Sequence, residues 1–418
     1  MTGPSRLQQA NRRGRHAAAE SSGSRIPIYT AEFAADPHGF YQRMRERYGA
    51  LAPVDLAPGV PATLVLGHRT AVRILEDPTH FPADPRAWQQ KAPAGLPIVA
   101  MMRYRPNALR TTGSEHERYR SVTVAALAGV DLNSLRSVIS RTAVALINEF
   151  CADGAADLID RYVTPLVFRV LGEVTGCPPA LADRLCTALT AVFDMRNDED
   201  AVTAAETTLA ELVAAARAEP GDDLVSRLIG HSAQLSDDEV VDQLLAVHRA
   251  GIEPARDLIA NTLLLVLTDP RFTTNQVGFA PPTREALEEV LATEPPLAHH
   301  SIVYPPLPVL IEDVWLPADQ PVLVSPAACH DDPERTAGRN PHHGPNLAWG
   351  AGPHACPAQA RAITYLLAEE AVDQLLDALP DLRPEFGPDD PVWRSNPFQR
   401  ALTALRVTFP PTPGMTVP

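Results

Sequence analysis

WGAGPHACPAQ, residues 349–359, places Cys356 behind two glycines, a proline and a histidine. Pro353 and Pro357 have no backbone N–H, so this segment cannot run as a regular helix. Gly350 and Gly352 permit backbone angles and close approaches that other residues do not. The composition therefore predicts a tight loop that holds one sulfur at a fixed point, with backbone N–H groups free to face it.

The overall composition is that of a globular protein. The chain has 418 residues, 45% of them hydrophobic and 21% charged, and a net charge of −15. This charge argues against a general nucleic-acid or anionic-membrane binder. Five cysteines without a CxxC pair argue against a disulfide framework or a zinc site, and they fit a reducing cytoplasm. No apolar run reaches the roughly eighteen residues that a membrane span needs.

Helical patterns dominate the chain, and they predict a fold that is mostly α with small β-sheets. Residues 1–25 read as a disordered tail, and residues 26–418 contain no clear linker, so we expect one large domain. Apolar spacing predicts long helices over 133–152, 156–175, 179–195, 200–218 and 236–268. Strands are expected at 62–67, 322–325 and 401–409.

The longest helical pattern starts near residue 239 and is apolar on more than one face, which predicts a helix through the core. Gly251 and Pro254 interrupt it midway. Pro254 cannot donate to the carbonyl of Ala250, so the helix should kink there. The kink is either a packing feature or an opened turn that faces a cofactor, with Glu253 beside it.

Four stretches together resemble the cytochromes P450. WGAGPHACPA matches that family's cysteine-ligand loop, an aromatic residue followed by GxGxHxCxG, with Ala358 where glycine is usual. AGIEPA (250–255), GSEHERYR (113–120) and NPFQRALTALRVTF (396–409) resemble its central helix, its haem-side helix and its C-terminal sheet, in the family's order. The resemblance covers roughly residues 27–412 and is strongest to soluble actinobacterial members.

The resemblance implies a single cytochrome P450-type domain with haem b between the long central helix and the cysteine-ligand loop. Cys356 is then the axial iron ligand, because a thiolate pushes electron density toward the iron. The resemblance places the remaining cofactor-binding residues at His116, Arg120, His354, Trp349 and Gly350. It places the catalytic residues at Ala250, Gly251 and Glu253.

Two departures from the family pattern stand out. The ExxR motif appears as Glu289 followed by Ala292, so its arginine is missing, and Arg335 or Arg339 is expected to replace it as the partner of Glu289. The central-helix threonine is replaced by Pro254. That hydroxyl normally helps to deliver protons, so Glu253 and water are expected to carry them instead.

The resemblance implies a haem-thiolate monooxygenase that oxidises a small natural-product-like substrate with O2, and with electrons from a ferredoxin and its reductase. One alternative is oxidative radical coupling of aromatic groups, on a peptide or another substrate, without oxygen insertion. Another is a non-catalytic haem-protein partner. We also expect a cytoplasmic location, with neither nucleic acid nor membrane as a partner.

The resemblance locates the substrate pocket only by region of the chain and not by individual contacts. The loop at residues 91–107 should cover it, with Met101 and Met102 as adaptable apolar walls. Leu297, Ala298 and Phe398 belong to two further pocket-lining regions, and core packing would explain each of them equally well. Arg103 and Arg105 could recognise an acidic substrate group, although solvated loop residues are the simpler interpretation.

Overall fold

The computed structural model describes residues 25–193, 199–273, 282–336, 346–387 and 391–417. The predicted tail over residues 1–25 lies outside the described residues except for Arg25. The Arg25 guanidinium donates to the carbonyl of Ala62 at 3.0 Å and to the side chain of Gln320 at 3.2 Å. Arg25 therefore belongs to the folded domain, because these acceptors hold its side chain against the sheet.

Helices make up most of the described chain, as predicted. The N-terminal half contains α2 (Ala31–Ala35), α3 (Pro37–Tyr48), α4 (His68–Leu75), α5 (Arg86–Gln89), α6 (Pro97–Met102), α7 (Gly113–Ala128), α8 (Leu132–Asn148), η1 (Ile159–Val163), α9 (Thr164–Thr175), α10 (Pro179–Phe193) and α11 (Glu199–Ala218). The C-terminal half contains α12 (Leu224–Gly230), α13 (Asp237–Thr268), α14 (Pro270–Thr273), α15 (Thr283–Thr293), α16 (Pro326–His330), α17 (Pro333–Thr336), η2 (Leu347–Trp349), η3 (Gly352–His354) and α18 (Ala358–Ala378).

Three small sheets accompany the helices. The largest has the strand order β1 (Ile26–Pro27), β2 (Leu51–Ala57), β3 (Val60–Val65), β8 (Val322–Val324), β5 (His300–Val303). The others join β4 (Ala155–Asp157), β10 (Arg406–Thr408) and β9 (Arg383–Pro384), and β6 (Val309–Ile311) with β7 (Val314–Leu316). The expected strand at 401–409 forms only over its last third.

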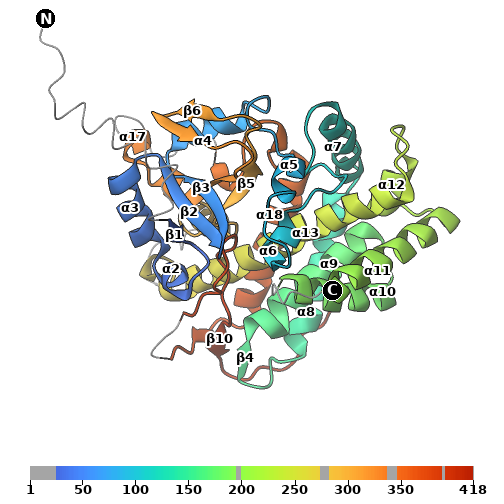
Figure 1. The fold of residues 1–418 in the computed structure, drawn as a ribbon. Coiled ribbons are helices and arrows are strands. Elements are labelled where there is room, and N and C mark those ends of the chain that lie inside the picture. The colour runs from blue at the N-terminus through green and yellow to red at the C-terminus, as the bar shows by residue number, and fades with distance from the viewer. Residues whose placement is uncertain (1–24, 194–198, 274–281, 337–345, 388–390, 418) are drawn as a thin grey trace, which may run out of the picture.

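The central helix α13 extends across the molecule. In Figure 1 the sheet strands β1, β2, β3 and β5 lie on the left and the helices α7, α9, α10, α11 and α12 lie on the right, and α13 reaches into both parts. Its start carries a capping box, in which Ser236 and Glu239 each accept a hydrogen bond from the other's backbone N–H. Pro254 lies inside the helix without ending it.

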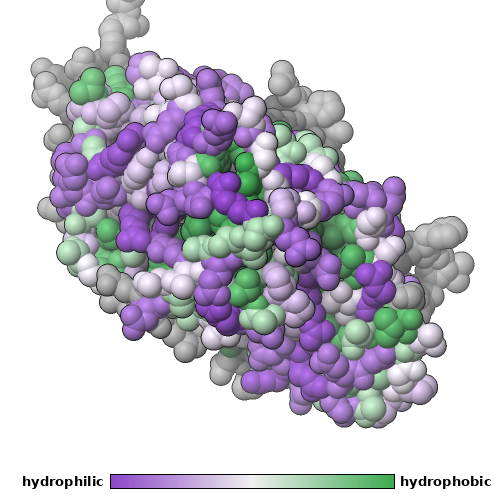
Figure 2. All heavy atoms as spheres, turned by 90° about the vertical axis from the view of Figure 1, so that its right-hand side faces the viewer, coloured by the Kyte–Doolittle hydropathy of each residue, from purple (hydrophilic) through white to green (hydrophobic). Residues whose placement is uncertain are grey.

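The described residues form three apolar core clusters. The first is formed mainly by α8, α9, α13 and α18, and the second packs on the five-stranded sheet and includes Met102, Tyr304 and Phe398. The third includes residues of α4 and of strands β5, β6, β7 and β8. On the side of the molecule that lies on the right in Figure 1, apolar atoms sit recessed among hydrophilic ones, as Figure 2 shows.

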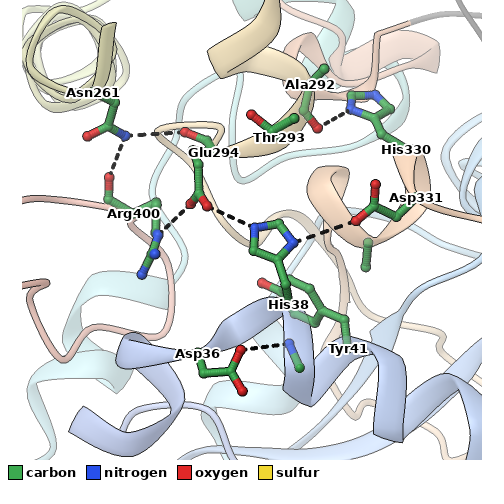
Figure 3. A network of polar contacts seen from close by, with 12 residues as sticks. Asp36, His38, Tyr41, Asn261, Ala292, Thr293, Glu294, His330, Asp331 and Arg400 are labelled. Atoms are coloured by element: carbon green, nitrogen blue, oxygen red, sulfur yellow. Dashed lines mark hydrogen bonds and ion pairs between the residues drawn. The ribbon is translucent and has the colours of Figure 1, made fainter. Parts of the chain in front are cut away.

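A polar network joins the N-terminal helices to the rest of the domain (Figure 3). His38 on α3 lies 2.9 Å from a carboxylate oxygen of Glu294 and 3.6 Å from one of Asp331. Arg400 donates to the same Glu294 carboxylate at 2.6 Å. Hydrogen bonds to Asp331 and Glu294 raise the pKa of His38 to about 9, so the imidazole is charged at neutral pH and bridges the two carboxylates.

No single helix in the described ranges is long and apolar enough to cross a membrane. The helices α7 and α8, which are bent by 71° relative to each other, reach that length and composition only when they are taken together.

Candidate active site

The loop that carries Cys356 is as tight as its sequence predicts. Gly350 and Gly352 have φ angles of +70° and +65°, in the left-handed region that favours glycine. A Cβ on Gly352 would lie 2.0 Å from the carbonyl oxygen of Leu75, so only glycine fits this close approach to α4. The backbone N–H of Cys356 donates to the carbonyl of Trp349 at 2.8 Å. Ala358 fits in place of the usual glycine because it begins α18.

Two histidines hold Leu347, the first residue of this loop's η2 turn. His330 Nε2 accepts from the Leu347 N–H at 3.1 Å, and His300 Nε2 lies 2.9 Å from the Leu347 carbonyl. His330 Nδ1 must then carry its proton and donate to the Ala292 carbonyl at 3.1 Å. Burial lowers the pKa of both imidazoles to about 4, so both are neutral at pH 7.

The missing ExxR arginine is thus replaced by a backbone contact at the same position. Ala292, which stands where that arginine is expected, offers its carbonyl to His330. Glu289 has a partner, as predicted, but the partner is Arg271 at 2.5 Å and the carboxylate is 31% exposed. The expectation of Arg335 is wrong, because Arg335 donates to the His330 carbonyl at 3.2 Å. Arg339 lies outside the described residues.

Three of the predicted cofactor-binding residues come together between α7 and the cysteine loop. His116 and His354 stack with ring centroids 4.0 Å apart, and Arg120 donates to the carbonyl of Ala355. Burial is the main cause that lowers the pKa of all three groups, that of His354 to about 3. His116 Nε2 is buried without a hydrogen-bond partner.

This cluster has more donors than acceptors. Its described ion pairs and hydrogen bonds include no carboxylate for His116, Arg120 or His354. Arg110, which the sequence did not single out, lies close enough to lower the pKa of His354. A buried group of cations and N–H donors without an anion fits a ligand that carries carboxylates of its own.

Cys356 lies beside this cluster. Burial raises the pKa of its thiol to about 11, while the guanidinium groups of Arg361 and Arg120 act in the opposite direction. A metal ion bound to the sulfur would remove the proton, as it does for any thiol ligand. The five cysteines are unpaired, and the described part of the chain contains no group of three or more His, Cys, Asp or Glu residues that could hold a metal.

Glu253, on α13, is 3% exposed and therefore fully within the protein. One carboxylate oxygen accepts a hydrogen bond from Gln399, and the other lies 3.5 Å from Arg256. Burial, followed by the nearby Asp257, raises the pKa of Glu253 to about 8. The group therefore exchanges its proton near neutral pH, which is the property that general acid–base catalysis needs.

The other two predicted catalytic residues flank Glu253 on the same helix. Ala250 is exposed on α13, and Gly251 is half-buried. A Cβ on Gly251 would reach the Leu171 side chain at 3.5 Å, an ordinary contact, so the described surroundings do not require glycine there. The Ala250 carbonyl cannot receive its usual helical hydrogen bond, because Pro254 has no N–H.

The predicted pocket residues fall into two groups. Met102 and Phe398 are buried in one core cluster, with Met101 packed against it. Leu297 and Ala298 are half-buried, and Leu297 forms an antiparallel bridge with Gln399. Because Gln399 also donates to Glu253, this bridge brings the second group next to the central helix.

Sequence comparison finds whole-length relatives, although no family model matches the chain. The monooxygenase PikC from Streptomyces venezuelae is 29% identical over 394 residues, which cover 90% of this chain and 92% of PikC. The 6-deoxyerythronolide B hydroxylase from Saccharopolyspora erythraea is 26% identical over 401 residues, which cover 90% of this chain and 96% of that enzyme.

Structure comparison agrees with the sequence comparison. The cytochrome P450 CYP154C4 from Streptomyces superposes with a TM-score of 0.81 and 27% identity. The superposition covers 92% of this chain and 98% of that structure. The likeness therefore extends over nearly the whole chain.

Proposed function

Because the chain belongs to the cytochrome P450 superfamily, we propose that it is a haem-thiolate monooxygenase of a small natural-product-like molecule. It is an oxidoreductase, and haem b is its cofactor. The proposed reaction joins one atom of O2 to a substrate C–H bond and releases the other atom as water. Two electrons and two protons complete the balance.

The residues around Cys356 fit this cofactor. Haem b carries two propionate carboxylates, and the cluster of His116, Arg120 and His354 offers donors without an anion next to the sulfur. This donor excess beside Cys356 is the observation that carries the proposal. When bound, the haem supplies an iron whose thiolate ligand favours cleavage of the O–O bond.

Proton supply is assigned to Glu253. Pro254 and Ala255 offer no hydroxyl, so the carboxylate of Glu253 is the adjacent side-chain group that can carry a proton. Gln399 holds one of its oxygens and leaves the other without a hydrogen bond. With a pKa of about 8, Glu253 can give up a proton and take another from water within one cycle.

We assign electron delivery to a ferredoxin that approaches the side of the cysteine loop in the cytoplasm. A pocket of about 770 Å³ opens there, and Trp349 of the cysteine loop is part of its lining. Its three arginines, Arg136, Arg284 and Arg361, are matched by the carboxylates of Glu288, Glu369 and Glu370. The proposal therefore rests on the position of this pocket beside the cysteine loop.

Oxidative coupling of aromatic groups is the second candidate. The absence of a hydroxyl at positions 254 and 255 favours it, because a coupling reaction can use protons that the substrate itself releases. A coupled product has two hydrogen atoms fewer and no new oxygen atom.

Reaction under ¹⁸O2 separates the two candidates. The enzyme would be supplied with a ferredoxin, its reductase and NADPH, with 6-deoxyerythronolide B and related macrolactones as the first probes. A product that carries one ¹⁸O atom supports monooxygenation, and a product without ¹⁸O that has lost two hydrogens makes coupling the function. A reduced carbon monoxide complex without the red-shifted Soret band of a thiolate ligand contradicts both.

A further inference from the structure

Arg249 lies in the middle of α13, half-buried, and forms no hydrogen bond or ion pair with any residue in the described ranges. Its unpaired guanidinium remains accessible, since none of its nitrogens is among the buried unpaired atoms of the described residues. Two neighbouring arginines are paired with carboxylates. Arg256 lies 2.9 Å from Asp257, and Arg105 lies 2.8 Å from Asp242 and 2.6 Å from Glu206. Arg249, unlike these two, is available to bind an anionic ligand.

The helix geometry shows where Arg249 points. Residues 242, 246, 249 and 253 follow one another at spacings of four, three and four, so they share one stripe of α13. The acid at each end of this stripe is already engaged, since Asp242 binds Arg105 and Glu253 binds Gln399. Ala246 and Ala250 beside Arg249 are small, and Ala250 is exposed, which leaves room over this part of the stripe.

The loop at residues 103–110 lies against the same stripe. Gln243 donates to the Pro106 carbonyl at 3.0 Å and accepts from the Ala108 N–H at 3.3 Å, so the loop is tied to α13 two turns before Arg249. This docking brings a second guanidinium close. The Arg110 side chain donates to the Met101 carbonyl at 3.5 Å and has no carboxylate partner among the described residues.

The local charge is positive at neutral pH. Burial lowers the pKa of Arg249 to about 10, and the positive charge of Arg110 lowers it further, yet the group stays protonated at pH 7. Glu253 is the nearby acid that acts in the other direction, and its own raised pKa of about 8 keeps it mostly neutral. The positive charges of Arg110, Arg105 and Arg103 thus act on Arg249, and Glu253 is the acid that opposes them.

We infer that Arg249, with Arg110 adding to the positive potential, binds a carboxylate carried by the substrate. The inference rests on the proposed function and narrows its substrate class to small organic acids. A guanidinium pairs with a carboxylate through two parallel hydrogen bonds, and that pair gains strength in a site that excludes water. The apolar body of the acid would lie along Met101 and Met102, which adjoin the same loop.

A series of imidazole probes tests this inference in the haem-loaded protein. The probes are ω-(imidazol-1-yl)alkanoic acids of increasing chain length and the matching alcohols, whose imidazole anchors each of them at the iron. The shift of the Soret band reports the dissociation constant. We expect the acid to bind at least tenfold more tightly than the alcohol at one or more chain lengths. Arg249→Met should abolish this preference, and Arg249→Lys should keep part of it.

Arg184→Met is the matched control, because it removes the same charge from an exposed position on α10, where Arg184 pairs with Glu211 at 2.6 Å. It should leave the preference for the acid unchanged. Equal affinity for acid and alcohol at every chain length overturns acid recognition alone. Absence of a Soret shift with 1-butylimidazole overturns the haem-thiolate assignment, and this inference with it. Haem content of each variant shows whether it has folded.

Discussion

The two sides of the site use opposite kinds of polar residues. On the cysteine-loop side, neutral His300 and His330 satisfy both backbone groups of Leu347, and each imidazole has partners on both nitrogens. On the α13 side, Glu253 has one carboxylate oxygen without a hydrogen bond, and Arg249 has no partner among the described residues. We call the cysteine-loop side the saturated side, because its histidines have complete hydrogen bonds. We call the α13 side the open side, because these two side chains keep unpaired polar atoms among the described residues.

This difference follows from what each side has to do. A sulfur ligand must stay at one point, and neutral groups with complete hydrogen bonds hold a loop without the desolvation cost of charges. Proton transfer and ligand binding need groups whose charge can change or be matched by something that arrives. The neutral histidines beside the cysteine loop and the buried charges on α13 therefore serve different ends.

The contrast between the cysteine-loop side and the α13 side has no functional meaning if Cys356 does not bind the haem iron. Cys356→Ala should abolish the red-shifted Soret band of the reduced carbon monoxide complex, because no other ligand in the loop supplies a thiolate. Cys329→Ala is a suitable control, since that buried thiol donates to the Val65 carbonyl and lies in a different part of the fold. A Cys356→Ala protein that keeps the band would refute the assignment.

Glu253 tests whether the open side carries protons. Glu253→Gln keeps the shape and the contact with Gln399 but removes the titrating group, so turnover should fall by about 10²–10⁴-fold if oxygen insertion is the reaction. Pro254→Thr should raise the product formed per NADPH consumed, because it restores a hydroxyl. Both variants can be measured with the same substrate.

If Glu253→Gln changes the stability of the protein but not its turnover, Glu253 is a structural residue paired with Arg256. Unchanged turnover in Glu253→Gln together with no gain in Pro254→Thr would count against the proton role. Radical coupling would then become the better description of the chemistry.

His330 tests the saturated side. His330→Leu leaves the Ala292 carbonyl and the Leu347 N–H without partners, which should cost about 2–4 kcal/mol of stability. Denaturant-induced loss of the Soret band measures it. His330→Gln can donate to one group and accept from the other, so it should recover most of the loss.

The hydrogen bonds made by neutral His330 should also make the stability of the protein sensitive to acid. The pKa of His330 is about 4 in the folded state and near 6.5 when unfolded, so the unfolded chain binds more protons between these values. Stability should be complete above pH 6.5 and should fall by about 2 kcal/mol per histidine from pH 6.5 to 5. A slope that is the same in the wild type and in His330→Gln would contradict this origin.

The smallest effect is expected at His38, which lies away from both sides. Its folded pKa of about 9 exceeds the unfolded value, so its contribution is complete below about pH 6.5 and is lost as the pH rises through 9. The side chain is 37% exposed, and solvent screening limits the expected cost of His38→Gln to about 1 kcal/mol at pH 7. Melting curves of both proteins should converge at pH 10.

Local sequence predicted the elements whose signals are strong over their whole length. The central helix was expected at 236–268 and runs over Asp237–Thr268, because a capping box and a continuous apolar pattern define it. Strand β2 was missed because Pro53 interrupts its pattern. The structure tolerates this proline because β1 pairs only with Val54 and Asp55, so no strand lies beside Pro53 on that side.

By itself, the sequence determined the tight loop of Cys356, because glycine and proline set its backbone conformation locally. The donors His116, Arg120 and His354 were assigned by the family resemblance, and the helical spacing of four places His116 and Arg120 on one face. Only the tertiary structure decided which partners the side chains found. His330 reaches Leu347 and Ala292, Arg271 reaches Glu289, and Arg249 reaches no described partner, because each of these outcomes depends on segments that are distant in the chain and that folding brings together.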